Sequence, residues 1–256
     1  MEPDPRPSHG VVSSAISVLA KAPLRGLAKT RLEPLLGTAG CARFQAACLH
    51  DVTRKAARVA PGASTLAISP WPAGNQFARL LPDRLLVRPQ ADGDLGLRIG
   101  AALSSALSRH EHVLVLGSDS PDLPPARLTQ AIELLSEGSE VVIGPAFDGG
   151  YYLIGVTRGA LDRLGGRLTA LWHDLPWSTD GICAAQVERA RSLGLRTVLL
   201  DPWWDVDQPV DYERLATRLK GEPLDQDSAV GAFVQKRSHS WLDRFDPDPD
   251  RWPTGE

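Results

Sequence analysis

Three acidic side chains follow predicted strands, where they could bind a divalent cation. Asp119 lies in Leu116-Gly-Ser-Asp-Ser-Pro, directly after an apolar run, and Asp205 and Asp207 are two residues apart further along the chain. A carboxylate just past a buried strand is costly unless it is hydrogen-bonded or holds a cation. Mg²⁺ commonly takes one or two carboxylates together with substrate phosphates. The alternatives are a helix cap for Asp119 and simple solvation for the Asp205/Asp207 pair.

A basic turn supplies the opposite charge. Lys21, Arg25, Lys29 and Arg31 place four cations within eleven residues, and Gly26 bends the backbone between them. The backbone N–H groups and cationic side chains of such a turn are suited to hold phosphate. Charge alone would favour a merely solvated turn, but its place after the first predicted strand favours a function. The GxxxxGK[ST] pattern is absent, so this is not a Walker loop.

A glycine-rich loop precedes a predicted helix at residues 90–98. Gly93 and Gly96 in this loop would let a nucleotide base or sugar approach the backbone closely. The alternative is an ordinary loop in which Asp94 caps the helix, and the sequence favours neither interpretation.

Two later segments are candidates for an acceptor site. Asp148 and Gly149 begin an Asp-Gly-Gly-Tyr-Tyr turn that predicts a β-hairpin. The adjacent tyrosines must point to opposite faces of a strand, so one of them could face a ligand. The candidate acceptor residues are Asp148, Gly149, Tyr151, Trp177 and Ser178.

The remaining reactive residues exclude several other kinds of site. The six histidines form no HxH or HExxH pattern, and the three cysteines form no CxxC, so a zinc centre or a disulfide framework is not expected. No serine lies in a GxSxG elbow, which argues against a serine hydrolase.

Composition places the chain among ordinary globular proteins. Hydrophobic residues make up 43% and charged residues 23% of the 256 residues, which is enough apolar material for a large core. The formal net charge of −3 provides no basic field for nucleic acid or an anionic membrane, so neither is expected as a partner. The start of the chain is acidic and proline-rich, unlike a signal peptide, and no apolar run is long enough to span a membrane. We therefore expect a cytoplasmic protein; its oligomeric state is open.

The elements that must position these residues alternate between strands and helices. Strands are predicted at 11–20, 64–69, 85–88, 112–117, 140–144, 151–156 and 197–200. Helices are predicted at 38–59, 95–108, 124–136, 186–193 and 209–220. This order, with one hairpin, predicts an α/β fold: a Rossmann-like three-layer α/β/α domain with a mostly parallel central sheet. Ligands of such sheets bind beyond the carboxyl ends of the strands, where the acidic and basic segments lie.

The predicted domain covers residues 11–220. Prolines in residues 1–10 predict a disordered tail. The regular pattern ends near Gly221, and residues 221–256 are expected to be loosely packed or disordered, although Trp241 and Phe245 could dock on the body.

Taken in order, these motifs resemble those of the DUF2064 family over roughly residues 13 to 215. The motifs are Ala20-Lys-Ala-Pro-Leu-Arg-Gly-Leu-Ala-Lys-Thr-Arg-Leu32, Gln90 to Arg98, Leu116-Gly-Ser-Asp-Ser-Pro, Asp148-Gly-Gly-Tyr-Tyr-Leu-Ile-Gly, Trp177-Ser-Thr and Asp205-Val-Asp. The resemblance implies the glycosyltransferase-A, or nucleotide-diphospho-sugar transferase, fold. That fold also includes the phospholactate and phosphoenolpyruvate guanylyltransferases, and this sequence resembles those enzymes in its Lys29-Thr-Arg turn.

The resemblance implies roles for individual residues. Lys29 and Arg31 would contact phosphates, and Asp119 with Asp205 or Asp207 would hold Mg²⁺ or Mn²⁺. Lys29 and Asp119 are the expected catalytic residues. The expected nucleotide- and phosphate-binding set is Lys21, Arg25, Gly26, Lys29, Arg31, Gly93 and Gly96.

The sequence also departs from its relatives at three positions. Gln208 and Val210 stand where relatives often have Thr and Glu, and Leu97 where many have Glu. These departures leave the geometry of the metal site and the nucleobase open.

Three functions follow from these observations. The leading one is a Mg²⁺-dependent glycosyltransferase that moves a sugar from a nucleotide sugar to a small acceptor. The alternative is a nucleotidylyltransferase that joins NMP from an NTP to a phosphorylated molecule and releases pyrophosphate. The third is a nucleotide-binding protein without catalysis, which the convergent carboxylates disfavour.

Overall fold

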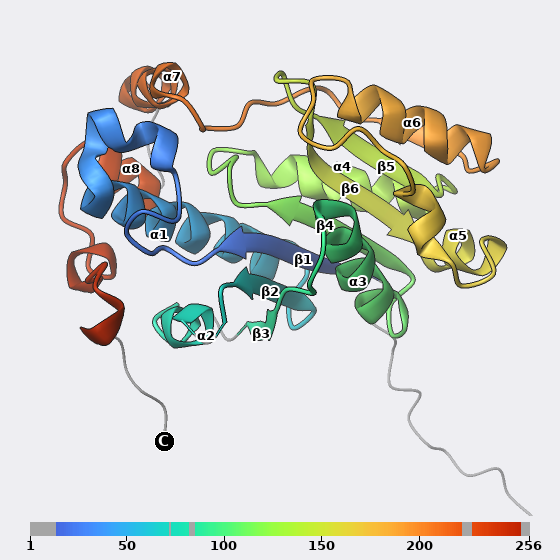
Figure 1. The fold of residues 1–256 in the computed structure, drawn as a ribbon, viewed down its shortest axis with the longest axis horizontal. Coiled ribbons are helices and arrows are strands. Elements are labelled where there is room, and N and C mark those ends of the chain that lie inside the picture. The colour runs from blue at the N-terminus through green and yellow to red at the C-terminus, as the bar shows by residue number, and fades with distance from the viewer. Residues whose placement is uncertain (1–13, 72, 82–84, 222–226, 252–256) are drawn as a thin grey trace, which may run out of the picture.

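The computed structural model describes residues 14–71, 73–81, 85–221 and 227–251, and shows one mixed sheet with helices on both faces (Figure 1). The tail predicted at 1–10 and the first three residues of the strand predicted at 11–20 lie outside the described residues. The strands are β1 (Ser14–Lys21), β2 (Ser64–Ser69), β3 (Leu86–Pro89), β4 (His112–Gly117), β5 (Val141–Pro145), β6 (Tyr151–Thr157) and β7 (Thr197–Leu199).

The strand order is β3-β2-β1-β4-β6-β5-β7, and β6 is the described strand that runs against its neighbours. The chain moves outward from β1 to β2 and β3, then returns to place β4 on the other side of β1. The carboxyl ends of β1 and β4 therefore flank the point where the strand order reverses, which is where open α/β sheets bind ligands. The predicted three-layer α/β/α fold with a mostly parallel central sheet is confirmed.

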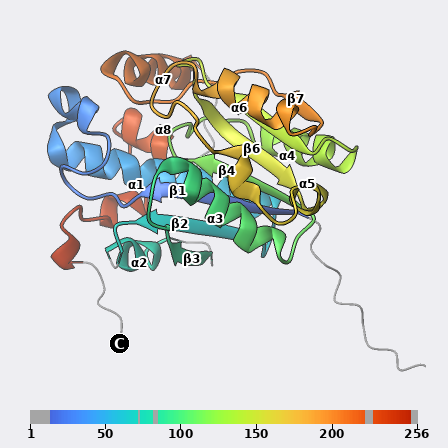
Figure 2. The same cartoon turned by 45° about the vertical axis from the view of Figure 1, so that its right-hand side comes forward.

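Helices cover the two faces of this sheet. The α-helices are α1 (Glu33–Val59), α2 (Ala73–Ala78), α3 (Leu95–Leu107), α4 (Pro125–Ser136), α5 (Arg158–Arg163), α6 (Ile182–Ser192), α7 (Pro209–Gly221) and α8 (Ala229–Val234). Helices α1 and α4 contact each other and the central strands, while α3 packs on β1 and β4 from the opposite face (Figure 2). Of these helices, α2, α5 and α8 have six residues each, too few for a clear periodic signal, and they were not predicted.

Helix α1 carries a kink close to the predicted helix start. Gly37 has a φ of +67°, which a glycine adopts without steric cost, and the regular helix continues from Thr38 as predicted. Helix α1 buries Phe44 and Leu49 completely, and the Phe44 ring contacts Tyr212 of α7 and Phe233 of α8. Helix α6 begins four residues earlier than predicted, at Ile182, because Gly181 is its N-cap.

The C-terminal segment differs from the prediction of loose packing. Trp241 and Phe245 are 9% and 3% exposed, and both rings contact Phe77. Trp241 donates its indole N–H to the carbonyl of Leu80. Residues 227–251 therefore form part of the body, and it is the docking of Trp241 and Phe245, which the sequence allowed, that buries their apolar surface.

A buried carboxylate fixes this segment to α1. Asp51 accepts hydrogen bonds from the Ala229 N–H at 2.9 Å, the Val230 N–H at 3.1 Å and the Ser228 hydroxyl at 2.7 Å. Burial by itself raises the pKa of Asp51, but hydrogen bonds from His50, Ser228 and Ala229 outweigh it and hold the pKa below its ordinary value. One carboxylate thus satisfies the otherwise unpaired first amides of α8.

We expect Asp51→Ala to lower the free energy of unfolding by about 3 kcal/mol, because it leaves buried N–H groups without an acceptor. Since the folded-state pKa of Asp51 is depressed, its stabilisation is present above the unfolded-state value and is lost as the pH falls below about 4. Urea unfolding at pH 7 and pH 3 measures both effects. Asp162→Ala, at an exposed aspartate of α5, is the control and should change stability by less than about 0.5 kcal/mol. Equal stability of Asp51→Ala and wild type at pH 7 would contradict this role.

None of the helices in the described part of the chain is long and apolar enough to span a bilayer.

Candidate functional site

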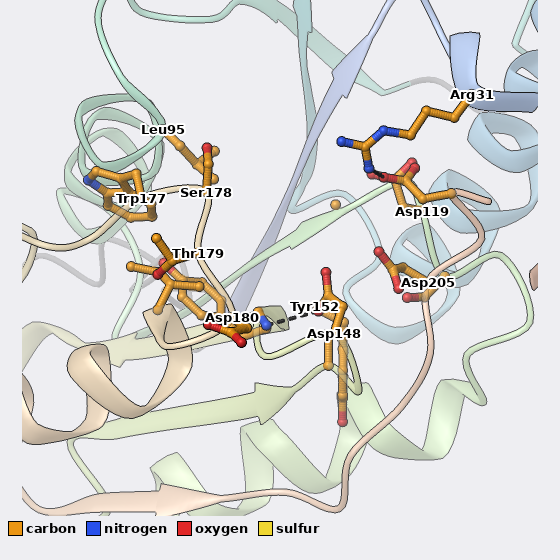
Figure 3. Close-up of a pocket in the computed structure, with 17 residues that line it drawn as sticks. Arg31, Leu95, Asp119, Asp148, Tyr152, Trp177, Ser178, Thr179, Asp180 and Asp205 are labelled. Atoms are coloured by element: carbon orange, nitrogen blue, oxygen red, sulfur yellow. Dashed lines mark hydrogen bonds and ion pairs between the residues drawn. The ribbon is translucent and has the colours of Figure 1, made fainter.

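A cleft of about 500 Å³ opens at the carboxyl end of β4 (Figure 3). Its walls come from the loop after β1, the loop after β4, the β5–β6 turn, the segment before α6 and the segment before α7. The lining residues are Arg31, Leu95, Gly117, Asp119, Ser120, Ala146, Asp148, Gly150, Tyr151, Tyr152, Trp177, Ser178, Thr179, Asp180, Ile182, Asp205 and Asp207. A second cavity of about 260 Å³ adjoins it, shares Leu95, Asp119 and Asp207, and adds Lys21, Lys29 and Gln90.

The predicted cation and carboxylates meet at one point. The ammonium group of Lys29 pairs with Asp119, donates to the carbonyl oxygen of Val206 at 2.8 Å, and lies 3.4 Å from Asp207 Oδ1. The Lys29 side chain is 2% exposed, whereas those of Asp119 and Asp207 are 49% and 42% exposed. The buried amine therefore holds two carboxylates that still face the cleft.

The backbone and the charge of Lys29 are both constrained. Its φ of 55° and ψ of 33° are left-handed, which is uncommon for a residue with a side chain and occurs often at functional sites. Burial alone lowers the pKa of Lys29, but the carboxylates of Asp119 and Asp207 outweigh it, so the pKa lies above its ordinary value. The amine is thus charged at neutral pH.

Backbone bonds join the two acidic segments. The Val206 N–H donates to the Asp119 carbonyl at 2.8 Å, which aligns residues 205–207 with the loop after β4. Asp211 accepts from the Gln208 N–H at 2.8 Å at the start of α7. The Asp122 carboxylate accepts hydrogen bonds from the indole N–H groups of Trp203 and Trp204, so its role is structural.

Negative charge accumulates beside this junction. Burial raises the pKa of Asp205 to about 6, and the nearby carboxylates of Asp148, Asp207 and Asp119 contribute to the rise. Among the described residues, no three His, Cys, Asp or Glu side chains are arranged to hold a metal ion. The predicted trio of Asp119, Asp205 and Asp207 therefore surrounds one end of the cleft without forming a complete set of ligands.

Of the predicted acceptor residues, Trp177 and Ser178 lie at the other end of the cleft, Asp148 lies between the two ends, and Gly149 is not among the lining residues. Tyr151, Trp177, Ser178 and Asp148 all face the cleft, and Tyr152 lines it as well. The hydroxyl of Tyr151 donates to Gln186 Oε1 at 3.5 Å. Figure 3 places Trp177 and Ser178 across the cleft from Arg31, Asp119 and Asp205.

Two glycines have roles other than those predicted. Gly96 is buried, and a Cβ built there would lie 2.6 Å from the Trp177 ring and 2.8 Å from Trp172 Cβ, so it permits tryptophan packing. Gly149 has a φ of +90°, and a Cβ there would lie 1.9 Å from the Asp180 carbonyl oxygen. It therefore permits close contact between the β5–β6 turn and the segment before α6.

Three other predicted phosphate-binding residues lie outside both sets of cavity-lining residues. Arg25 and Gly26 are exposed on the basic turn, and Gly93 forms an exposed turn with a φ of +107°. The carbonyl of Gly93 accepts from Arg98 Nε at 3.1 Å, and Asp94 accepts from the Leu97 N–H at 2.9 Å and caps α3. The structure thus confirms the cap by Asp94, and this loop reaches the smaller cavity through Gln90, Leu95 and Arg98, not through Gly93 or Gly96. Lys21 does line the smaller cavity.

Sequence reasoning did not select several polar residues of the site. Gln45 Nε2 donates to Ser118 Oγ at 3.0 Å, and Gln90 Nε2 donates to the carbonyls of Ala20 and Ala67 at 2.8 and 3.0 Å. Thr179 and Asp180 also line the larger cleft. Gln90 and Thr179 belong to predicted motifs and Asp180 directly follows one, but Gln45 lies inside α1, where nothing in the sequence marks it.

We expect Gly149→Ala to impair turnover in the predicted transfer reaction more than predicted nucleotide binding, because its methyl group would displace the Asp180 backbone and with it the cleft wall predicted to bind the acceptor. The positive φ should also cost more than about 1 kcal/mol of stability. Turnover and thermal unfolding measure these effects. Gly181→Ala is the matched control: its φ is −92° and the added Cβ would meet only the Thr179 hydroxyl at 3.8 Å. Wild-type turnover by Gly149→Ala would contradict this role.

Comparison with protein families gives a match over half of the chain. Residues 52–179 match the model of a family described as an uncharacterized protein conserved in bacteria, DUF2064. No curated protein is significantly similar to the chain.

Solved structures share the fold over most of the chain. A Desulfovibrio desulfuricans G20 protein, provisionally named a nucleotide-diphospho-sugar transferase, is 26% identical, with a TM-score of 0.77 over 88% of this chain and 97% of its own. A cytidylyltransferase from Leptospira borgpetersenii is 14% identical, with a TM-score of 0.55 over 88% of this chain and 93% of its own. The 4-diphosphocytidyl-2C-methyl-D-erythritol synthase of Anaerococcus prevotii is 13% identical, with a TM-score of 0.52 over 81% and 99%. The last two show only that the chain has the fold of nucleotide-using transferases.

Proposed function

The chain belongs to the DUF2064 family, and we propose that it is a glycosyltransferase that moves a sugar from a nucleotide sugar to a small acceptor. The observation that carries the proposal is the junction of Lys29, Asp119 and Asp207 at the switch point of the sheet. The likeness to the Desulfovibrio protein supports a diphospho-sugar as the donor.

The donor would occupy both cavities. We place its nucleoside in the smaller cavity, beside Lys21 and Gln90, and its sugar in the larger cleft. Its diphosphate would then lie where the two cavities meet, near Lys29 of the smaller cavity and Arg31 of the larger cleft. Positioned charges of this kind stabilise the negative charge that develops on a leaving diphosphate.

The donor set is suited to a divalent cation. Carboxylate oxygens are the ligands that Mg²⁺ and Mn²⁺ prefer, and one or two of them suffice when substrate phosphates complete the shell. Burial raises the pKa of Asp205, the carboxylates of Asp148, Asp207 and Asp119 add to the rise, and a bound cation would offset the repulsion among these carboxylates. We propose that Asp119 holds the ion together with Asp205 or Asp207. When bound, it would act as a Lewis acid toward the diphosphate.

Nucleotidyl transfer is the second candidate. Lys21, Lys29 and Arg31 follow one another from the smaller cavity to the larger cleft, an arrangement that could also neutralise a triphosphate. In that reaction a phosphorylated acceptor would attack the α-phosphate and pyrophosphate would leave.

Ligand binding separates the candidates. The full-length protein with Mg²⁺ is tested by thermal shift against NTPs, nucleoside diphosphates and nucleotide sugars, and each stabilising ligand is then assayed for turnover. Stabilisation by a nucleotide sugar, with release of nucleoside diphosphate, is the expected result. Stabilisation by an NTP with release of pyrophosphate would replace the proposal by nucleotidyl transfer. No response to any nucleotide would reject both.

A further inference from the structure

We propose that the acceptor is an uncharged hydroxyl compound, such as a sugar or polyol, and not a phosphorylated or carboxylated one. This inference rests on the proposed glycosyl transfer and names the substrate class of the same cleft. It is carried by the charges of the cleft wall, the bonding of the nearest helix terminus and the side chains left to contact a ligand.

The lining of the larger cleft is strongly acidic. Its described residues include five carboxylates and a single basic side chain, Arg31. Arg31 lies 3.5 Å from Asp207 and, in Figure 3, across the cleft from Trp177. The five carboxylates are Asp119, Asp148, Asp180, Asp205 and Asp207. Among the described lining residues, an acceptor phosphate beside Trp177 would meet carboxylates on its own side of the cleft and the cation of Arg31 only across it, although proteins bind phosphate mainly through Arg, Lys and free backbone N–H groups.

At the helix terminus nearest the acceptor wall, the first two N–H groups are bonded within the protein. Helix α6 begins at Ile182, which lines the cleft, and its first N–H groups could in principle hold an anion. The Cys183 N–H donates to the Gly149 carbonyl at 3.0 Å, and the Ile182 N–H donates to the Thr179 carbonyl at 3.4 Å. Asp180 adds a negative charge two residues before the helix. With these two N–H groups engaged and a carboxylate beside them, this terminus is poorly suited to hold a phosphate or carboxylate.

The remaining side chains suit a neutral hydroxyl compound. Trp177 is half-buried and presents part of its indole to the cleft, where an apolar ring face can pack on it. Asp148 and Asp180 can only accept hydrogen bonds when ionised, and hydroxyl groups are neutral donors. The Ser178 hydroxyl, exposed beside them, can donate or accept.

The transfer step balances with such an acceptor. An acceptor hydroxyl oxygen forms a bond to the anomeric carbon of the donor sugar while the bond from that carbon to the β-phosphate oxygen breaks. The nucleoside diphosphate leaves with the electron pair, and the hydroxyl proton passes to a cleft carboxylate. Asp148 lies between the two ends of the cleft in Figure 3 and is the carboxylate we assign to this proton.

Matched acceptor pairs test the proposal. The full-length protein, Mg²⁺ and the nucleotide sugar that stabilises it are incubated with glycerol or glycerol 3-phosphate, and with glucose or glucose 6-phosphate. Nucleoside diphosphate release and product mass are measured. We expect kcat/KM for the neutral member to exceed that for the phosphorylated member at least tenfold. Equal use or preference for the phosphorylated member would overturn the acceptor class, while the glycosyl transfer itself would stand.

A charge-reversing variant tests whether the acidic cleft lining causes the preference for neutral acceptors. Asp180→Lys should lower the ratio of kcat/KM for the neutral acceptor to kcat/KM for the phosphorylated one at least threefold, because the new cation can hold the phosphate. The Kd for the nucleotide sugar should change less than twofold. Glu188→Lys is the matched control, since Glu188 is exposed on α6 and outside the cleft lining, and it should leave the preference unchanged. The same narrowing in both variants would overturn the proposal. Failure of every nucleotide sugar to bind would instead reject the proposed function.

Discussion

Lys29→Met should lower kcat/KM for transfer at least 100-fold. Methionine is unbranched and close to lysine in length, so it fills the same buried space but cannot neutralise phosphate or hold the two aspartates. The loss of one positioned charge or donor in other enzymes costs 10²- to 10³-fold. Steady-state kinetics with saturating Mg²⁺ measure the effect.

The fold should survive this substitution. Removing one partner of a fully buried ion pair costs about 3–5 kcal/mol, but Asp119 and Asp207 are about half exposed and water can solvate them. Lys29→Arg should recover little activity, because the larger planar guanidinium cannot occupy a position that is 2% exposed. Lys220→Met, at an exposed lysine of α7, is the control and should behave as wild type. A Lys29→Met protein with wild-type kcat/KM would reject the role of this amine.

The sequence predicted the site best where charged residues directly follow segments with a clear strand pattern. Asp119 follows the apolar run of β4, and Lys29 lies in a basic turn after β1, so the α/β switch-point rule was sufficient to bring them together. The contact between Lys29 and residues 206–207 spans about 177 positions, yet it follows from the same rule.

The side chains of glycine-rich loops and of the tail were less predictable. Glycine signals either a ligand or a close neighbour, and for Gly96 and Gly149 the neighbour is the protein's own Trp172 or Asp180. The docking of residues 227–251 depends on Asp51, a carboxylate buried within α1, whose partners lie far away in sequence. Such pairings are set by tertiary packing and leave no local pattern.

Asp119→Asn should lower turnover about 1000-fold or more, and Asp119→Ala should abolish it, while both proteins remain folded. Asparagine keeps the shape of the side chain and the backbone bond from Val206 to the Asp119 carbonyl, so the change tests the charge alone. A 1000-fold loss corresponds to about 4 kcal/mol of transition-state stabilisation. Turnover against Mg²⁺ concentration and Mn²⁺ binding in the presence of nucleoside diphosphate are the measurements. Normal turnover by Asp119→Ala would reject the metal assignment.

The companion variants Asp205→Asn and Asp207→Asn separate the two remaining carboxylates. Asp207 already pairs with Lys29 and Arg31, at 3.4 and 3.5 Å, whereas Asp205 has no cationic partner among the described residues, and burial together with the surrounding carboxylates raises its pKa. A cation entering the cleft therefore relieves more repulsion at Asp205 than at Asp207. We expect Asp205→Asn to weaken Mn²⁺ binding at least tenfold, and Asp207→Asn to act mainly on turnover through the displacement of Lys29. The reverse order of Mn²⁺ affinities would instead identify Asp207 as the partner of Asp119.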